Sequence, residues 1–168
     1  MSVYVTVGST GFDDLVRAVS SKEFLRSLAS RGFRRLTVQY GSSEQAFSPP
    51  QTQTDTFGVA IESFDYTSTP LRFVDQADLV ICHAGTGSIL EALHSRKPAI
   101  VVVNRRLMDN HQSEIATALA REGYLVASEP DELASAVAEG QFTKLRPYPR
   151  ADPQPIGEIL DEETLLPQ

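Results

Sequence analysis

Short runs of apolar, mostly β-branched residues recur along the chain, and most are followed by a segment whose apolar residues have helical spacing. Strands joined by helices lie parallel in one sheet, and the helices cover both of its faces. The run 99–103 is apolar throughout, which is typical of a central parallel strand. The alternation therefore predicts an α/β fold, a Rossmann-like doubly wound parallel sheet of about six strands.

Apolar spacing, and glycine or proline at the ends of segments, give the order of the expected elements. Residues 42–56 are rich in Ser, Thr and Gln without an apolar period, which predicts a mainly exposed loop. We assign residues 1–140 to one domain. Its strands are expected at 3–7, 36–40, 57–64, 78–82, 99–103 and 124–127, and its helices at 12–30, 70–74, 88–96, 111–122 and 130–139.

The segment 141–168 differs because five of the ten prolines fall after residue 146. Proline neither continues a helix nor donates a hydrogen bond to a sheet, so 145–155 is expected to be extended or irregular. A short acidic amphipathic helix is expected after it. Two interpretations stay open: a frayed terminus, or an arm that wraps back on the domain or docks on a partner.

Charge and cysteine content exclude several classes of protein. In 168 residues, 22 acidic against 15 basic side chains give a net charge of −7, which argues against non-specific binding to nucleic acid. The single cysteine, Cys82, cannot form a disulfide within the chain, and no apolar run approaches the roughly 20 residues that span a bilayer. We expect a cytoplasmic protein without a secretory signal.

Two glycine-bearing turns follow expected strands, Gly8-Ser9-Thr10-Gly11 and Gly85-Thr86-Gly87-Ser88. In open parallel sheets, ligands bind at the carboxyl ends of the strands. Glycine lets the backbone approach a ligand, and the helix expected after each turn offers N–H groups to an anion. Ser88 could cap its helix or bond a phosphate oxygen. The two turns therefore predict a phosphate-binding edge.

Glu91 follows Ser88 by three residues, and helical side chains lean toward the N-terminus of their helix. Its carboxylate could accept hydrogen bonds from a ribose diol, or act only as a capping or helix-dipole group. His83 is either a histidine at the edge of the core or a catalytic base. Asp109 and Asn110 can cap the helix after them, or polar groups of this loop could bond sugar hydroxyls; capping explains the adjacent His111 and Gln112 less well. All of these alternatives stay open.

The spacing of motifs disfavours several further classes of ligand and site. The G-x-G-x-x-G fingerprint of dinucleotide sites fails at Leu90, and no glycine-rich loop ends in Lys-Ser/Thr, so NAD and ATP hydrolysis are disfavoured. His83, His94 and His111 lack the spacing of metal ligands, and Ser88 does not lie in a nucleophile elbow. A nucleoside diphosphate attached to another group remains.

The sequence resembles the catalytic subunits of the two-subunit dolichol-pathway GlcNAc transferases, which carry a glycosyltransferase family 28 C-terminal domain. The resemblance covers most of the chain except 42–56 and about the last dozen residues. It implies the C-terminal, sugar-nucleotide-binding half of a GT-B glycosyltransferase. The segments that carry it are 83–91 (His-Ala-Gly-Thr-Gly-Ser-Ile-Leu-Glu), Lys97-Pro98, 107–112 (Leu-Met-Asp-Asn-His-Gln), 5–12, 39–41, 62–66 and 143–149.

The resemblance also implies the reaction and the partner. GlcNAc would pass from UDP-GlcNAc to dolichyl-diphosphate-GlcNAc in N-glycan precursor assembly, with no metal and no cofactor. A membrane-anchored acceptor-binding subunit would recruit the chain to the cytosolic face of the endoplasmic reticulum. The Pro-rich tail would then be the docking arm.

Site residues carried over by position divide among the parts of the donor. Gly85, Thr86, Gly87 and Ser88 would face the diphosphate, and Glu91 the ribose. Phe64 and Asp65 would border the uracil, whereas Gly8, Ser9 and Thr10 would line the opposite wall. Asn110, His111 and Gln112 would contact the sugar or its phosphate. The catalytic residue is not identified: His83 is the local candidate, or the partner supplies the base.

Two other functions remain compatible with the sequence. One is a non-catalytic UDP-sugar-binding assembly module that keeps the fold but turns nothing over. The other is a self-sufficient epimerase or hydrolase of a sugar nucleotide, which one small domain without a second lobe disfavours.

Overall fold

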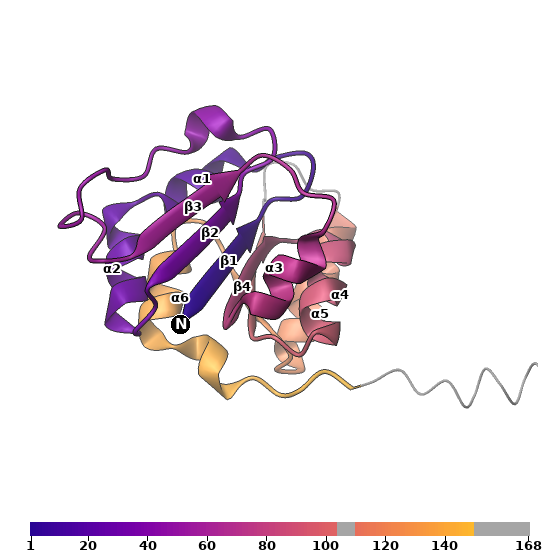
Figure 1. Cartoon of the computed structure of the whole chain (residues 1–168). Helices are drawn as coiled ribbons and strands as arrows, with labels where there is room; N and C mark the ends of the chain where they lie inside the picture. The colour runs from indigo at the N-terminus through magenta and orange to yellow at the C-terminus, as the bar shows by residue number, and fades with distance from the viewer. Residues whose placement is uncertain (104–109, 150–168) are drawn as a thin grey trace, which may run out of the picture.

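The computed structural model describes residues 1–103 and 110–149 of the chain, and in them six parallel strands form one sheet (Figure 1). The sheet has the order β3-β2-β1-β4-β5-β6, which confirms the predicted doubly wound α/β fold. The strands are β1 Ser2–Thr6, β2 Arg35–Gln39, β3 Ala60–Phe64, β4 Leu79–His83, β5 Ala99–Val102 and β6 Val126–Ser128. The helices are α1 Asp13–Val19, α2 Lys22–Ser30, α3 Pro70–Gln76, α4 Thr86–His94, α5 Asn110–Arg121 and α6 Leu133–Glu139, with 3-10 turns η1 Glu44–Ala46 and η2 Gln141–Lys144.

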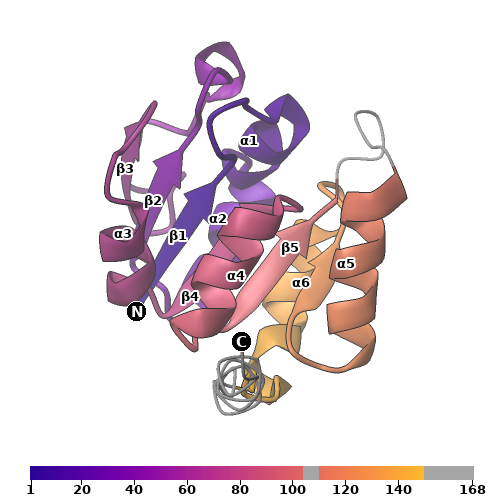
Figure 2. The same ribbon diagram turned by 90° about the vertical axis from the view of Figure 1, so that its right-hand side faces the viewer.

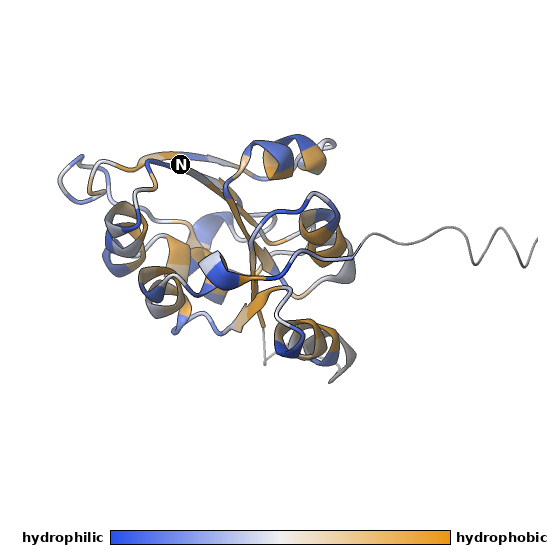
Figure 3. Cartoon of the chain, turned by 90° about the horizontal axis from the view of Figure 1, so that it is seen from below, coloured by the Kyte–Doolittle hydropathy of each residue, from blue (hydrophilic) through white to orange (hydrophobic). Residues whose placement is uncertain are grey.

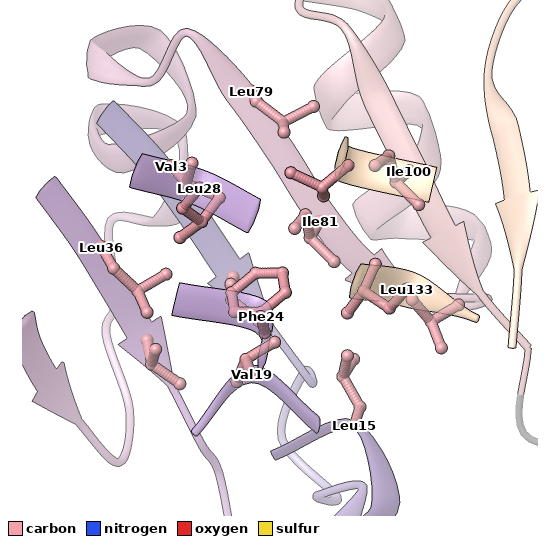
Figure 4. Packing of buried hydrophobic residues seen from close by; sticks show 14 of the residues in the cluster. Val3, Leu15, Val19, Phe24, Leu28, Leu36, Leu79, Ile81, Ile100 and Leu133 are labelled. Carbon is pink, nitrogen blue, oxygen red and sulfur yellow. The ribbon is translucent and has the colours of Figure 1, made fainter. Parts of the chain in front are cut away.

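Helices cover both faces of the sheet, and each face has its own apolar core. Helices α3, α4 and α5 lie in front of the sheet in Figure 2, whereas α1, α2 and α6 lie behind it. Seen from below in Figure 3, the strands in the middle are mainly hydrophobic, while the helices on either side also carry hydrophilic residues. Figure 4 shows the core behind the sheet, where Val3 and Ile81 from the strands meet Phe24, Leu28 and Leu133 from the helices.

The single helix expected at 12–30 is wrong, because α1 ends at Val19 and α2 begins at Lys22. The Ser20 hydroxyl donates to the carbonyl of Val16, and the Ser21 hydroxyl accepts a hydrogen bond from the N–H of Phe24. Serine favours such local bonds over a continuous helix, and Ser21 is the N-cap of α2. Two adjacent serines thus divide one apolar pattern between two helices.

The loop expected at 42–56 is present, but it is tethered to the domain. Ala46 is buried, and Phe47 stacks on Tyr40 with ring centroids 5.7 Å apart. Farther along, the Lys22 ammonium lies 2.7 Å from a carboxylate oxygen of Asp55. The loop therefore lies along the β2–β3 side of the sheet with fixed contacts at both of its ends.

Residues 141–149 also pack against the domain, along the lower edge of the sheet in Figure 1. Phe142 is buried, with its ring centroid 5.9 Å from that of Phe33. The N–H of Arg146 donates to the carbonyl of Gly123 at 2.8 Å, and Tyr148 meets the ring of Tyr124 edge-on. These residues therefore share the cores of residues 1–140. The short helix expected after residue 155 lies outside the described residues, and the docking role of 141–168 stays a prediction.

Replacing Phe142 with alanine tests how firmly this segment is attached. We expect Phe142→Ala to lower the free energy of unfolding by about 3 kcal/mol, because it removes a buried ring and leaves a cavity. Urea unfolding measures the change. The neighbouring exposed Gln141→Ala should stay within about 0.5 kcal/mol of the parent protein. Equal stability of the two variants would mean that the segment contributes no packing energy.

Candidate functional site

Strands β1 and β4 are neighbours in the sheet, and the chain moves outward from them in opposite directions, to β2 and β3 on one side and to β5 and β6 on the other. This is the topological switch point, where open α/β sheets bind ligands at the carboxyl ends of their strands. The two predicted turns, 8–11 and 85–88, follow β1 and β4 directly. The fold thus brings both predicted walls of the site to one edge of the sheet (Figure 2).

His83 lies between the two turns. A Cβ atom on Gly8 would come within 2.7 Å of the imidazole Cε1, and one on Gly85 would overlap the Nε2 atom. Gly8 also has a φ of 70°, which other residues rarely adopt. Neither glycine can therefore gain a side chain while the ring stays in place. The two turns therefore meet at the His83 imidazole.

The His83 imidazole favours its uncharged form at neutral pH. Burial lowers the pKa of His83, and a backbone hydrogen bond with Thr6 offsets this effect only in part. Its Nδ1 atom is buried and has no hydrogen-bond partner within 1–103 and 110–149. The ring can therefore accept a proton or a hydrogen bond, and it offers no permanent positive charge to a phosphate. These properties fit both the core-edge and the base interpretation.

Helix α4 begins two residues earlier than predicted, at Thr86, with Gly85 as its N-cap. The expectation that Ser88 could cap this helix is wrong, because Ser88 is already its third residue and no side chain caps the helix. Thr86 and Gly87 are exposed, and a Cβ atom on Gly87 would face open space. The first N–H groups of α4 therefore open onto the edge of the sheet, where an anion is favoured.

The first turn does not provide a second helix N-terminus of this kind. Helix α1 begins at Asp13, after Phe12 rather than directly after the turn, and its first turn carries Asp13 and Asp14. Both carboxylates lie within 3.4 Å of the Arg17 guanidinium. Two negative charges disfavour a bound anion there. Any contribution of Gly8, Ser9 and Thr10 to anion binding must therefore come from the turn itself, where Ser9 and Thr10 are exposed.

Glu91 is half-buried on α4, above the face of the sheet that carries Tyr4 and Cys82. Burial and, after it, the negative charge of Glu91 raise the pKa of Cys82 to about 12. Burial raises the pKa of Tyr4 to about 12, and Glu91 again contributes. The carboxylate, which belongs to the second turn of its helix, is therefore near enough to Tyr4 and Cys82 to act on both groups. This position suits a group that accepts hydrogen bonds at the mouth of the site.

Phe64 and Asp65, which are expected to border the uracil, lie at the end of β3, the next strand but one from the switch point. Phe64 is half-buried and packs on Phe73, with ring centroids 4.8 Å apart, while the Asp65 side chain is exposed. The carbonyl of Asp65 accepts hydrogen bonds from the N–H of Gly41 and from the side-chain amide of Gln39. Sequence reasoning gave no role to Gln39. An amide at the end of a buried strand was the available signal, because such a group needs partners.

Asn110, His111 and Gln112 stand at the start of α5, which follows β5. Their side chains, and residues 104–109 before them, lie outside the described part of the chain. Within 1–103 and 110–149 no group of three or more His, Cys, Asp or Glu side chains is placed to hold a metal ion. Over the same residues no helix combines the length and the hydropathy needed to cross a bilayer.

The family model of the glycosyltransferase family 28 C-terminal domain matches residues 2–162. The chain belongs to this family. It is 35% identical to the UDP-N-acetylglucosamine transferase subunit ALG13 of Saccharomyces cerevisiae over 178 residues, which cover 88% of each chain. It is 43% identical to the subunit of the same name from Homo sapiens over 123 residues, 73% of this chain. The chain spans only about a tenth of the length of the human and mouse relatives.

Solved structures agree with the GT-B half-domain that the motifs predict. An NMR structure of ALG13 aligns with a TM-score of 0.67 and 34% identity, over 95% of this chain and 94% of that one. MurG of Acinetobacter baumannii aligns with a TM-score of 0.63. The alignment covers 96% of the present chain but only 49% of the MurG chain. At 16% identity, this second match shows the fold alone. The present domain thus corresponds in fold to about half of a larger glycosyltransferase.

The lowered pKa of His83 predicts a pH dependence of stability. Between the folded pKa and the usual value of about 6.5, the unfolded chain binds more protons than the folded chain. The free energy of unfolding should therefore fall as the pH drops through about 6.5. Urea unfolding at pH 7.5 and 5.5 should show a smaller fall for His83→Asn. His94→Gln, which removes an exposed imidazole, should keep the fall of the parent protein. A fall in His83→Asn equal to that of the parent protein would refute the lowered pKa of His83 as its cause.

Proposed function

We propose that the chain is the donor-binding, catalytic subunit of a two-subunit transferase that moves GlcNAc from UDP-GlcNAc to dolichyl-diphosphate-GlcNAc. The observation that carries the proposal is the meeting of the two glycine turns on His83 at the switch point of the sheet, beside the open N-terminus of α4. Membership of the family of UDP-N-acetylglucosamine transferase subunits supports the nature of the donor.

In this proposal the N-terminus of α4 faces the diphosphate of the donor. Transfer breaks the bond between the sugar C1 and a diphosphate oxygen, and an acceptor hydroxyl forms the new bond to C1. Negative charge develops on the departing diphosphate, where the helix N–H groups and the Ser88 hydroxyl can stabilise it. Gly8, Ser9 and Thr10 form the opposite wall. A neutral His83 between the walls is the local candidate for the base that takes the acceptor proton.

An acceptor-binding partner is part of the proposal because the chain corresponds to about half of a GT-B enzyme. The curated relatives are named as subunits, which implies a partner. The carboxyl edge of the sheet is open at the two glycine turns, where Ser9, Thr10, Thr86 and Gly87 are exposed. Such an edge is expected for a half-site that a second domain completes. We propose a membrane-anchored partner that recruits the chain to the cytosolic face of the endoplasmic reticulum.

The ribose role of Glu91 can be tested with paired ligands. Glu91→Ala should weaken UDP binding by about 10- to 100-fold, because hydrogen bonds to a charged group contribute about 1.5–3 kcal/mol. Calorimetry would compare UDP with 2′-deoxy-UDP and with pyrophosphate. We expect the parent protein to distinguish UDP from 2′-deoxy-UDP and Glu91→Ala to lose most of that difference, with little change for pyrophosphate.

A matched control is Glu132→Ala, which removes an exposed carboxylate at the start of α6 and should bind all three ligands like the parent. Equal losses for UDP and pyrophosphate in Glu91→Ala would exclude the ribose contact. Glu91 would then be a helix-dipole group.

Reconstitution tests the transfer itself. The full chain, co-expressed with candidate membrane partners, should transfer radiolabelled GlcNAc to a short-chain lipid diphosphate-GlcNAc acceptor, and each subunit alone should not. Binding of UDP-GlcNAc without turnover in the complete mixture would instead support the non-catalytic assembly module. Product from the chain alone would favour the self-sufficient epimerase or hydrolase.

A further inference from the structure

The side chain of Gln39 joins two of the turns that border the candidate site. It ends strand β2 and is 4% exposed, so it is almost completely buried. Its Nε2 group donates to the carbonyl of Gly8 and to the carbonyl of Asp65, each at 2.8 Å. Its Oε1 atom accepts a hydrogen bond from the hydroxyl of Thr6. One amide thus spans the ends of β1, β2 and β3.

The contacts fix which way the amide points. Both of its N–H donors meet carbonyl oxygens, and its oxygen meets a hydroxyl donor. The flipped amide would place its oxygen against the two carbonyls of Gly8 and Asp65, which is repulsive and leaves both without a donor. Glutamine is the one side chain of this length that offers two donors and one acceptor in this arrangement.

Neighbouring bonds tie the same turns to the sheet. The Thr6 hydroxyl, which donates to Gln39, also accepts a hydrogen bond from the N–H of Gly8 at 3.2 Å. On the other side, the N–H of Gly41 donates to the carbonyl of Asp65 at 3.0 Å. The Gly8 and Asp65 turns are therefore connected through one buried group rather than held separately.

We propose that Gln39 is a positioning residue for the nucleotide, resting on the function proposed above. It holds the Gly8 turn, which borders the phosphates, at a fixed distance from the Phe64–Asp65 turn, which borders the base. A uridine diphosphate that contacts both turns then binds without ordering them first, because the order is present before binding. Gln39 touches no part of the ligand and acts through the two turns.

The test compares two variants of the same strand in the full chain. Gln39→Glu keeps the size of the side chain but replaces the NH2 group, which donates both hydrogen bonds, with a carboxylate oxygen that faces the carbonyls of Gly8 and Asp65. Val38→Ala is the matched control, because Val38 is fully buried on the opposite face of the strand and belongs to the core behind the sheet. Val38→Ala should lower stability but removes no side-chain hydrogen bond to either turn.

Two readouts are taken. Amide hydrogen exchange, measured without ligand, should become at least about tenfold faster at residues 8–11 and 65–66 in Gln39→Glu, but not in Val38→Ala. Calorimetry should show UDP binding weakened by about tenfold or more in Gln39→Glu, equivalent to the loss of about one hydrogen bond, and nearly unchanged in Val38→Ala.

A second comparison uses the hydroxyl partner of the amide. Thr6→Val removes the donor to Gln39 and should loosen the Gly8 turn. Thr6→Ser keeps a hydroxyl and should retain the exchange rates and the UDP affinity of the parent protein. In Gln39→Glu, affinity relative to the parent should also recover in part as the pH falls, because a protonated carboxyl can donate one hydrogen bond.

Unchanged exchange at both turns in Gln39→Glu would overturn the proposal, and so would looser turns with the UDP affinity of the parent. Failure of the parent protein to bind UDP would instead refute the proposed function. The two failures are distinguishable, because exchange is measured without ligand and reports on the link between the turns by itself.

Discussion

The direct pairing of β1 with β4 is the contact on which the candidate site depends. Val3 pairs with Leu79 and Thr6 with Cys82, so segments far apart in the sequence end at the same edge of the sheet. Because the order of the strands reverses there, no crossover helix covers the gap between the two strand ends. The two glycine turns can therefore approach each other until both touch the ring of His83.

Within residues 1–103 and 110–149, the groups at this edge offer an anion dipoles more than full positive charges. The groups that meet there are the N–H groups at the start of α4, the hydroxyls of the two turns and a neutral imidazole. Glu91 adds a negative charge near Tyr4 and Cys82. In the proposed function this arrangement would separate the parts of a nucleotide: the diphosphate would lie by the helix N-terminus, whereas the carboxylate suits neutral hydroxyl groups.

Sequence analysis succeeded where apolar periodicity determined the structure, and it failed where the hydrogen bonds or backbone of individual residues did. The strands and most helices followed from apolar periodicity, to within a few residues. The division of 12–30 at Ser20 and Ser21 was missed because hydrogen bonds of two hydroxyls outweighed a continuous apolar period. The start of α4 was misplaced at Ser88, because the glycines at 85 and 87 made an earlier helix start look unfavourable.

By itself the sequence determined the fold class, the two glycine turns and the family, because periodicity, glycine positions and motifs are local properties of the chain. Tertiary structure alone decided that His83 lies between both turns, that α1 offers no anion site, and that residues 141–149 pack on the domain. It also decided the partners of Gln39, whose three hydrogen bonds reach residues 6, 8 and 65. Contacts between residues so far apart exist only once the sheet has formed, so no local pattern can reveal them.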